Sequence, residues 1–349
     1  MSQLLERAAY GPRNEVLFIQ EMNILTRHHL DGCPLYAKVW LGWQPATDVS
    51  EIPFLHVGVF KHLEFKTAVP GICYERTLRS SGTTSGIASR IPLDTKSSHF
   101  QSCSSAAILK DFLGEVPKPL LVLDSSRSLQ TRGEVSARIA AAMSLRPLAS
   151  DISFLLDEAE NPASINWARF ECSSGEHNDL LVYGFTWMLW LAWATQEKPP
   201  AIRHALSNKR IHFVHSGGWK KMESLNVSRE QFNHDLLQGL APGSSVLDFY
   251  GLVEQAGIIY PLCEAGFRHV PVWADVLVRD PLTLKPSASG NTGLLQLLNT
   301  LAWGAPYHSV LTEDLGRIEP GPCSCGRSGA RFEVIGRVPK AELRGCANV

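Results

Sequence analysis

The strongest constraint on the fold of this chain is the way short apolar runs alternate with helix-type segments along most of its length. Predicted strands, each bounded by turn residues, cover residues 119–124 (PLLVLD), 211–215 (IHFVH), 246–250 (VLDFY) and 272–278 (VWADVLV). Helices or buried apolar segments are predicted over residues 13–29, 136–144, 180–195, 229–238 and 294–302. Such an alternation favours an α/β architecture with substantial sheet content.

The composition limits the classes of protein to which the chain can belong. With 349 residues, 44% of them hydrophobic and 19% charged, the sequence is typical of a soluble globular protein with an ample core. A formal net charge of −1 argues against a general nucleic-acid or membrane-surface binder, because there is no overall positive field. The most apolar run, residues 180–195, is shorter than the roughly 20 residues that span a bilayer, so we expect a buried helix beside an apolar pocket.

Cysteine usage predicts a reducing compartment. Eight cysteines are scattered through the chain, and no basic stretch followed by an apolar segment marks a secretory signal at the N-terminus. We therefore expect a cytoplasmic protein with reduced thiols, in which the later cysteines are candidates for metal binding or chemistry.

Residues 79–90 (RSSGTTSGIASR) have the composition of a phosphate-binding loop. Gly82 and Gly86 allow a tight turn whose main-chain N–H groups point at one anion, and arginines bracket the loop with positive charge. Hydroxyl donors come from Ser80, Ser81, Thr83, Thr84 and Ser85. The loop is not a Walker loop, because no Gly-Lys-Ser/Thr closes it. The alternative interpretation is a serine-rich surface loop.

Three further segments carry groups suited to a nucleotide. In HSGGWKK (215–221), Gly217 and Gly218 let a planar ring lie close to the backbone, although an ordinary strand-ending turn has the same pattern. In YGLVE (250–254), Tyr250 can stack on a base and Glu254 can hold Mg²⁺. In TEDLG (312–316), Asp314 can accept hydrogen bonds from ribose hydroxyls, or can cap a local turn.

Together and in this order, the segments resemble the core motifs of adenylate-forming enzymes. More closely, residues 80–346 are similar to the acyl-protein synthetase family of the LuxE type. The resemblance is carried by SSGTTSGIASRIPLD (80–94), HSGGWKK (215–221), YGLVEQAG (250–257), EDLG (313–316) and GRVPKAELRGC (336–346). Phenylacetate-CoA ligases are more distant relatives that share the CxCGR element (323–327).

The resemblance implies the N-terminal-type domain of an adenylate-forming enzyme, an α/β fold with mixed sheets and flanking helices that lacks the full C-terminal lid. The implied division is a helical lead-in over residues 1–70, an AMP-binding acyl-activating domain over residues 71–335, and a short tail over residues 336–349 that carries Cys346. Ser85 departs from the family pattern, which usually has glycine there.

The same resemblance implies an assignment of the nucleotide-binding residues. The β- and γ-phosphates of ATP would lie in the loop of Ser80, Ser81, Gly82, Thr83 and Thr84. Adenine would be framed by Gly217, Gly218 and Tyr250 with the adjacent Gly251, while Glu254 would bind Mg²⁺ and Asp314 and Arg337 would hold ribose. A carboxylate would attack the α-phosphorus to give acyl-AMP and pyrophosphate, with positioning and charge neutralisation supplying most of the rate.

The implied second step is a thioester on Cys346, whose neighbours Arg344 and Lys340 favour the thiolate. Lys340, Lys220 or Lys221 would replace the lysine of the missing lid. A fatty or polyketide-like acyl group would then pass to a protein partner such as an acyl reductase, an acyl carrier protein or a synthase. Two alternatives stay open: transfer of an acyl group between a carrier protein or CoA and Cys346, and a degenerate nucleotide-binding subunit without catalysis.

A separate set of residues is suited to a metal. Cys263 and His269, followed by Cys323 and Cys325, supply three thiolates and one imidazole, which satisfy a tetrahedral structural Zn²⁺ site. The alternative is two buried cysteines, a capping histidine and a Cys-x-Cys turn.

Overall fold

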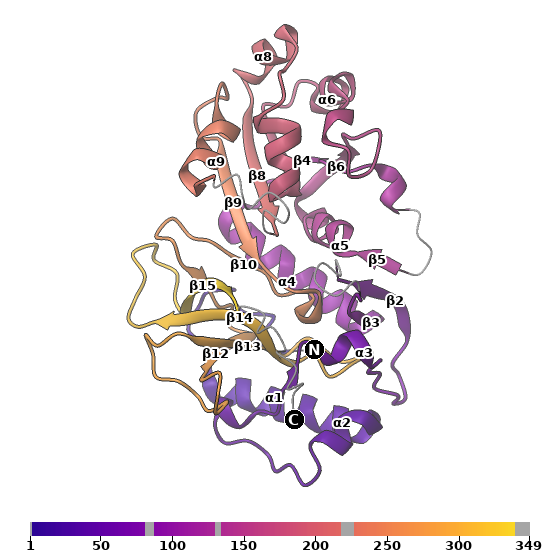
Figure 1. Cartoon of the computed structure of the whole chain (residues 1–349), viewed down its shortest axis with the longest axis vertical. Helices are drawn as coiled ribbons and strands as arrows, with labels where there is room; N and C mark the ends of the chain where they lie inside the picture. The colour runs from indigo at the N-terminus through magenta and orange to yellow at the C-terminus, as the bar shows by residue number, and fades with distance from the viewer. Residues whose placement is uncertain (1, 81–86, 130–133, 218–226, 339–349) are drawn as a thin grey trace, which may run out of the picture.

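The computed structural model describes residues 2–80, 87–129, 134–217 and 227–338. Figure 1 shows two layers of sheet structure stacked along the long axis, a parallel sheet in the upper half and an antiparallel sheet in the lower half. The strands are β1 (Leu55–His56), β2 (Tyr74–Arg79), β3 (Arg90–Asp94), β4 (Lys118–Val122), β5 (Glu134–Ser136), β6 (Ala149–Phe154), β7 (Asp179–Phe185), β8 (Arg210–Ser216), β9 (Ser245–Tyr250), β10 (Tyr260–Pro261), β11 (Arg268–His269), β12 (Ala274–Arg279), β13 (Gly293–Asn299), β14 (Ser309–Glu319) and β15 (Arg331–Arg337). The α-helices of the described residues are α1 (Glu15–Gly32), α2 (Pro34–Val39), α3 (Val59–His62), α4 (Thr95–Leu113), α5 (Ala137–Ser144), α6 (Trp167–Ser174), α7 (Thr186–Leu189), α8 (Pro200–Leu206) and α9 (Arg229–Leu237).

The parallel sheet has the strand order β10-β9-β8-β7-β4-β6, and only β10 runs antiparallel to its neighbour. Helices α6, α8 and α9 surround it in the upper half of Figure 1. All residues of β4 are buried, as expected for an interior strand covered on both faces, and this explains the apolar run over residues 119–122 that follows Lys118. Ligands of such sheets bind beyond the carboxyl ends of the strands.

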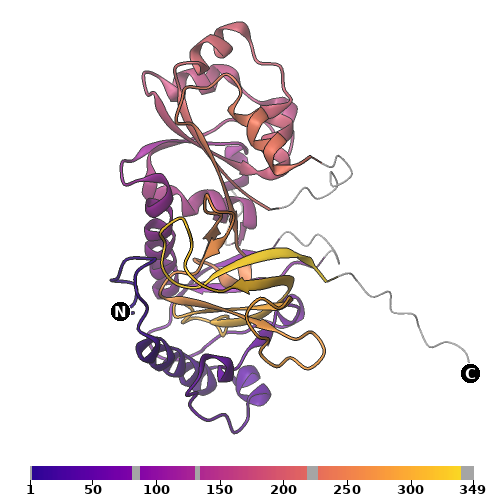
Figure 2. The same cartoon turned by 90° about the vertical axis from the view of Figure 1, so that its left-hand side faces the viewer.

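The antiparallel sheet has the order β11-β15-β14-β13-β12, and β1 joins it by pairing in parallel with β14. Helices α1 and α2 lie below this sheet in Figures 1 and 2. The third sheet, β3-β2-β5, is small and ends at the loop that was predicted to bind phosphate. Strand β1 belongs to the predicted helical lead-in over residues 1–70, so that segment contributes a strand to the antiparallel sheet. The domain boundary near residue 70 stays a prediction.

The structure corrects two of the predicted segments. Residues 180–195 do not form one helix: β7 occupies residues 179–185, followed by the single turn of α7 and a π-helix over Trp190–Ala194. Residues 294–302 begin with β13, every residue of which is buried. Both strands are buried on their two faces, so they lack the polar alternation that distinguishes a strand from a buried helix. Within the described ranges, no helix has the length and apolar character needed to cross a membrane.

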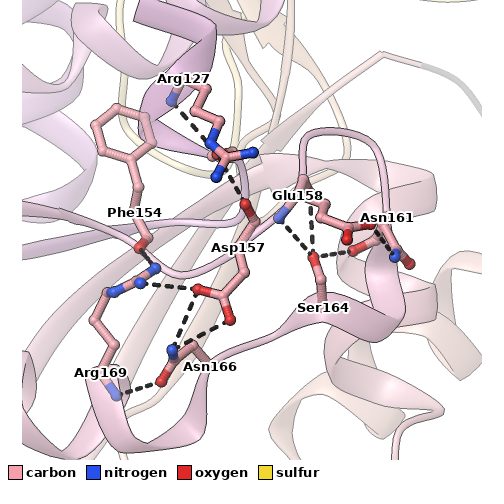
Figure 3. A network of polar contacts seen from close by, with 9 residues as sticks. Arg127, Phe154, Asp157, Glu158, Asn161, Ser164, Asn166 and Arg169 are labelled. Atoms are coloured by element: carbon pink, nitrogen blue, oxygen red, sulfur yellow. Dashed lines mark hydrogen bonds and ion pairs between the residues drawn. The ribbon is translucent and has the colours of Figure 1, made fainter.

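A polar network fixes the connection between β6 and α6 (Figure 3). Arg169 donates to the Phe154 carbonyl at 2.9 Å and to the Asp157 carboxylate at 2.8 Å. Asn166 caps α6 by accepting from the Arg169 backbone N–H and donates to Asp157 with its amide nitrogen. An antiparallel bridge between Leu156 and Ile165 and these side-chain contacts together hold the connection at the carboxyl edge of the parallel sheet.

Buried histidines lie between α1 and the antiparallel sheet. His29 contacts Thr67 Oγ1 at 2.7 Å and the Ala302 carbonyl at 2.9 Å, and His308 contacts Thr26 Oγ1 at 3.1 Å. Burial lowers the pKa of His308 to about 3. In the parallel sheet, burial lowers the pKa of His215 to about 4. Both imidazoles are therefore neutral in the folded protein at neutral pH.

We expect these histidines to make the fold acid-sensitive. Their pKa values are lower when folded than the ordinary value near 6.5, so the unfolded chain binds more protons and stability falls as the pH drops below about 6.5. Between pH 7 and pH 5, His215 and His308 together should reduce the free energy of unfolding by roughly 4 kcal/mol. Urea unfolding at both pH values measures this, and a His308→Gln variant should lose the contribution of His308, roughly 2 kcal/mol of the dependence. An unchanged dependence in that variant would contradict the prediction.

Candidate active site

The centre of the site is a partly buried polar junction between the two large sheets. Tyr250, at the carboxyl end of β9, donates from Oη to Asp314 Oδ2 at 2.7 Å. Asp314 lies on β14, directly opposite Arg337 on β15, and Arg337 Nε donates to Asp314 Oδ1 at 3.1 Å. The structure thus brings together three residues that the sequence motifs placed in one nucleotide site.

The electrostatics of the junction fix which group carries which charge. Asp314 is 5% exposed, so its carboxylate depends on its hydrogen-bond donors. Burial, together with the adjacent Asp314 carboxylate, raises the pKa of Tyr250 well above its usual range, so the phenol stays protonated and acts as the donor. The Arg337 side chain remains 61% exposed, which leaves this side of the pair accessible to a ligand.

A second link joins the same two sheets beside the first. Arg268 of β11 forms an ion pair with Asp248 of β9 and donates to the Tyr260 carbonyl at 2.8 Å. Its guanidinium carbon lies 5.9 Å from the centre of the Tyr250 ring. Burial alone would raise the pKa of Asp248, but the charge and hydrogen bond of Arg268 outweigh it and the pKa is lowered, so Asp248 is a carboxylate.

The turn after β8 carries the first glycine predicted to face a planar ring. Gly217 has φ +77°, a conformation that a side chain would strain, and a Cβ there would meet the Phe185 ring. Thr186, the first residue of α7, donates from Oγ1 to the Gly217 carbonyl at 2.5 Å. The hydroxyl proton of Thr186 is used in this bond, so Thr186 Oγ1 accepts a hydrogen bond from His215 Nδ1 at 2.9 Å. The Nε2 atom of the neutral His215 imidazole is then its hydrogen-bond acceptor. The carboxyl ends of β7 and β8 are held in fixed relation by these contacts.

The predicted phosphate loop is the connection of the β2–β3 hairpin. Arg79 of β2 pairs with Arg90 of β3, and the hydrogen bonding continues one step further to Ser80 and Ser89. The Ser80 N–H donates to the Ser89 carbonyl at 3.2 Å, and the Ser89 N–H donates to Ser80 Oγ at 2.8 Å. Ser80 therefore closes the base of the loop.

Glu254 lies in a 3₁₀ turn (Val253–Gln255) four residues after Tyr250 and is 5% exposed. Burial raises the pKa of its carboxyl group, and neighbouring groups, Ser89 and Arg337 among them, oppose the shift. A divalent cation would stabilise the charged form in this setting, so the residue fits its predicted role in holding Mg²⁺. Gly251 is close-packed, since a Cβ there would lie 3.4 Å from the Ile258 carbonyl.

The four predicted metal ligands converge. The ligand atoms of Cys263, His269, Cys323 and Cys325 all lie within 4.8 Å of one another. The Cys263 and Cys323 sulfurs are 3.9 Å apart, close to the about 3.8 Å that a tetrahedral site with 2.3 Å zinc–sulfur bonds requires. Cys325 Sγ is 3.1 Å from His269 Nε2. Three sulfurs and one imidazole in this arrangement fit a structural zinc ion.

Several predicted residues lie outside the described part of the chain: Ser81, Gly82, Thr83, Thr84, Gly218, Lys340 and Cys346. Conversely, Thr186, Asp248 and Arg268 contribute to the site but were not predicted. None of the three belongs to a recognisable motif, and their partners are set by how the sheets pack.

Comparisons with known proteins agree with the geometry. The family described as "Acyl-protein synthetase, LuxE" matches residues 19–349. The long-chain-fatty-acid–luciferin-component ligases of Aliivibrio fischeri and Vibrio harveyi are 30% identical over 144 and 141 residues, which are 40% and 39% of this chain. The chain covers 36% of the length of each of these relatives.

Solved structures show the same fold. A crystal structure of 2-hydroxyisobutyryl-CoA ligase in an open conformation, in complex with 2-HIB-AMP and CoA, has a TM-score of 0.71 at 15% identity and covers 97% of this chain and 79% of that chain. The same ligase in its postadenylation state has a TM-score of 0.69 at 16% identity, covering 95% of this chain and 70% of that chain. The predicted fold class is thereby confirmed.

The junction predicts a difference between two tyrosines. Replacing the partly buried Tyr250 by Phe removes a hydrogen bond to a buried carboxylate, so we expect the free energy of unfolding to fall by about 2 kcal/mol. Tyr10 is buried, but its hydroxyl has no hydrogen-bond partner among the described residues, so Tyr10→Phe should change stability by less than about 0.5 kcal/mol. Chemical denaturation of both variants makes the comparison, and equal losses would contradict it.

Proposed function

Since the chain belongs to the acyl-protein synthetase family of the LuxE type, whose profile spans residues 19–349, we propose that it activates a carboxylic acid with ATP and then holds the acyl group as a thioester on Cys346. The observation that carries this proposal is the Tyr250–Asp314–Arg337 junction at the carboxyl edge of the parallel sheet. A buried carboxylate between a neutral donor and an arginine is suited to accepting hydrogen bonds from the two vicinal hydroxyls of a ribose.

The nucleotide would extend from this junction to the β2–β3 loop. Adenine lies against the Gly217 turn and Tyr250, where the positive φ of Gly217 lets a planar ring approach the backbone. The phosphates reach the loop that Ser80 closes. Bound at Glu254, Mg²⁺ would supply charge neutralisation to the phosphate oxygens.

The first reaction is displacement at the α-phosphorus. An oxygen of the substrate carboxylate forms a bond to the α-phosphorus, the bond to the bridging oxygen of the β-phosphate breaks, and pyrophosphate leaves. The enzyme acts by aligning the two reactants and compensating the negative charge, which is how most phosphoryl-transfer catalysts work.

In the second reaction, the thiolate of Cys346 forms a bond to the acyl carbon of the adenylate, and the bond to the phosphate oxygen breaks with release of AMP. The thioester retains the acyl group in a reactive form that a partner protein can accept. The names of the two long-chain-fatty-acid–luciferin-component ligases support a long-chain fatty acid as the substrate and a separate component as the acceptor. An acyl reductase, an acyl carrier protein or a synthase would fill the acceptor role.

Intact mass spectrometry after incubation with Mg·ATP and a panel of fatty and aromatic acids tests the proposal. We expect an ATP-dependent mass increase equal to one acyl group, mapped to Cys346, with release of pyrophosphate. A Cys346→Ser variant should lose the thioester. An Asp314→Ala variant should raise the KM for ATP by about tenfold or more, because a buried acceptor for the substrate is lost.

The outcomes separate the proposal from its alternatives. In the first alternative, an adduct forms from acyl-CoA or an acyl carrier protein but never from a free acid with ATP. That result would show that the protein works by thioester transfer and not by adenylation. If neither an adduct nor pyrophosphate forms, the remaining alternative is a nucleotide-binding subunit without catalysis.

We also propose that Cys263, His269, Cys323 and Cys325 hold a structural Zn²⁺ ion. The donor set, the 3.9 Å separation of two sulfurs and the burial of His269 support this. When bound, the ion would cross-link the turn after β10 to the β14–β15 connection and would take no part in the acyl chemistry.

We expect the purified protein to contain about one zinc per chain, because the donor set is complete for a closed tetrahedral site. A Cys323→Ser variant should lose the metal and melt at a lower temperature. The matched control is Cys172→Ser, since Cys172 is an exposed free cysteine away from the cluster. Elemental analysis and thermal melts distinguish them, and equal zinc contents in the two variants would overturn the metal site.

A further inference from the structure

The two residues of β11 face different functional groups. His269 is one of the four metal ligands, and the adjacent Arg268 reaches the nucleotide junction through Asp248 and Tyr250. Successive side chains of a strand point to opposite faces, so His269 points toward the metal cluster and Arg268 points toward the nucleotide junction. We infer that metal occupancy controls nucleotide affinity through β11, with Arg268 as the positioning residue.

The first step of the argument is that the metal is the main covalent anchor available to β11. The strand is two residues long and pairs with β15 through Arg268 opposite Phe332 and His269 opposite Arg331. Two-residue strands have few ladder hydrogen bonds to hold their position. A zinc bond to His269 would tie β11 to Cys323 and Cys325 on the far side of the hairpin.

The second step is that Arg268 holds the base of the nucleotide site. It is 8% exposed and bridges the Asp248 carboxylate and the Tyr260 carbonyl. Tyr250, Tyr260 and Phe332 pack against each other with ring centres 5.1–6.3 Å apart, so Tyr250 and Phe332, the strand partner of Arg268, belong to one aromatic cluster. A shift of Arg268 would therefore leave the half-buried Asp248 carboxylate without its partner and disturb the packing of Tyr250.

The third step is that the metal is accessible. A cavity of about 370 Å³ opens next to the cluster and is lined by Cys325, Tyr10, Asp111 and Arg327, among others. Cys325 is the only one of the four ligands that is not buried. A small chelator or an incoming ion can therefore reach the cluster from this cavity, so occupancy can change without unfolding the sheets.

The inference rests on the proposed function, so its test measures nucleotide binding itself and not the overall reaction. The probe is AMP, which needs no Mg²⁺, and its Kd is measured by calorimetry for the zinc-loaded protein, the chelated protein and the zinc-restored protein. We expect chelation to weaken AMP binding by about tenfold and zinc to restore it. Zinc content and circular dichroism are recorded on each sample.

The decisive variant is Arg268→Met, which keeps an unbranched apolar stem and removes the charge. Loaded with zinc, it should bind AMP about tenfold more weakly than the wild type, with an unchanged zinc content, and its affinity should no longer respond to chelation. The control is Arg317→Met, since Arg317 lies on β14 of the same antiparallel sheet and pairs with Glu333 away from the junction. That variant should behave like the wild type.

Each other result has a separate meaning. If the AMP affinity of the Arg268→Met variant still falls on chelation, the role of Arg268 is wrong. If the Kd of the wild type for AMP is the same with and without zinc, the coupling is wrong. If the chelated protein unfolds, the comparison of zinc-loaded wild type with zinc-loaded Arg268→Met still decides the role of Arg268. Absence of AMP binding in every sample refutes the nucleotide site, and absence of zinc in the purified protein refutes the metal site; either result overturns the coupling as well.

Discussion

The hydrogen bond between Tyr250 and Asp314 is the contact on which the arrangement of this protein depends, because it joins the parallel sheet to the antiparallel sheet at the point where a ligand would bind. Apolar packing is tolerant of small shifts, whereas a buried carboxylate has a narrow set of positions in which its donors reach it. The junction therefore sets the register between the sheets more sharply than the surrounding core does. The ion pair of Arg268 and Asp248 fixes the same relation a short distance away.

Burying the Asp314 carboxylate lowers the stability of the fold, and the same burial prepares the carboxylate to bind a ligand. A desolvated carboxylate is several kcal/mol less stable than in water unless its hydrogen bonds replace the lost solvent. Tyr250 and Arg337 supply two donors to Asp314, and the open side of Arg337 leaves room for hydroxyl groups of a ligand to supply more. Binding then completes a network that the protein alone leaves partly satisfied, so part of the affinity comes from groups that are already held in place.

Much of this site was predictable from short motifs, and the limits of the prediction have physical causes. Tyr250, Asp314 and Arg337 each follow a local pattern, and the structure brings them together as predicted. Asp248 and Arg268 were missed because no spacing in the sequence reports which strands of different sheets pack against each other. The helix predicted over residues 180–195 was wrong in its first half because β7 is buried on both faces and shows no alternation. The convergence of Cys263, His269, Cys323 and Cys325 was predictable, since side chains able to bind zinc are few and their clustering is unusual, while the bound metal stays a proposal.

The β14–β15 hairpin connects the proposed metal site to the proposed nucleotide site. One end of the hairpin presents Asp314 opposite Arg337, and the connection at its other end carries Cys323 and Cys325. A hairpin is rigid only if both ends are held, and the loop end has no neighbouring strand to pair with apart from the two residues of β11. A zinc ion at that end would supply the missing constraint without adding residues to the core. The position of Asp314 would then be determined by the junction at one end of the hairpin and by the metal at the other.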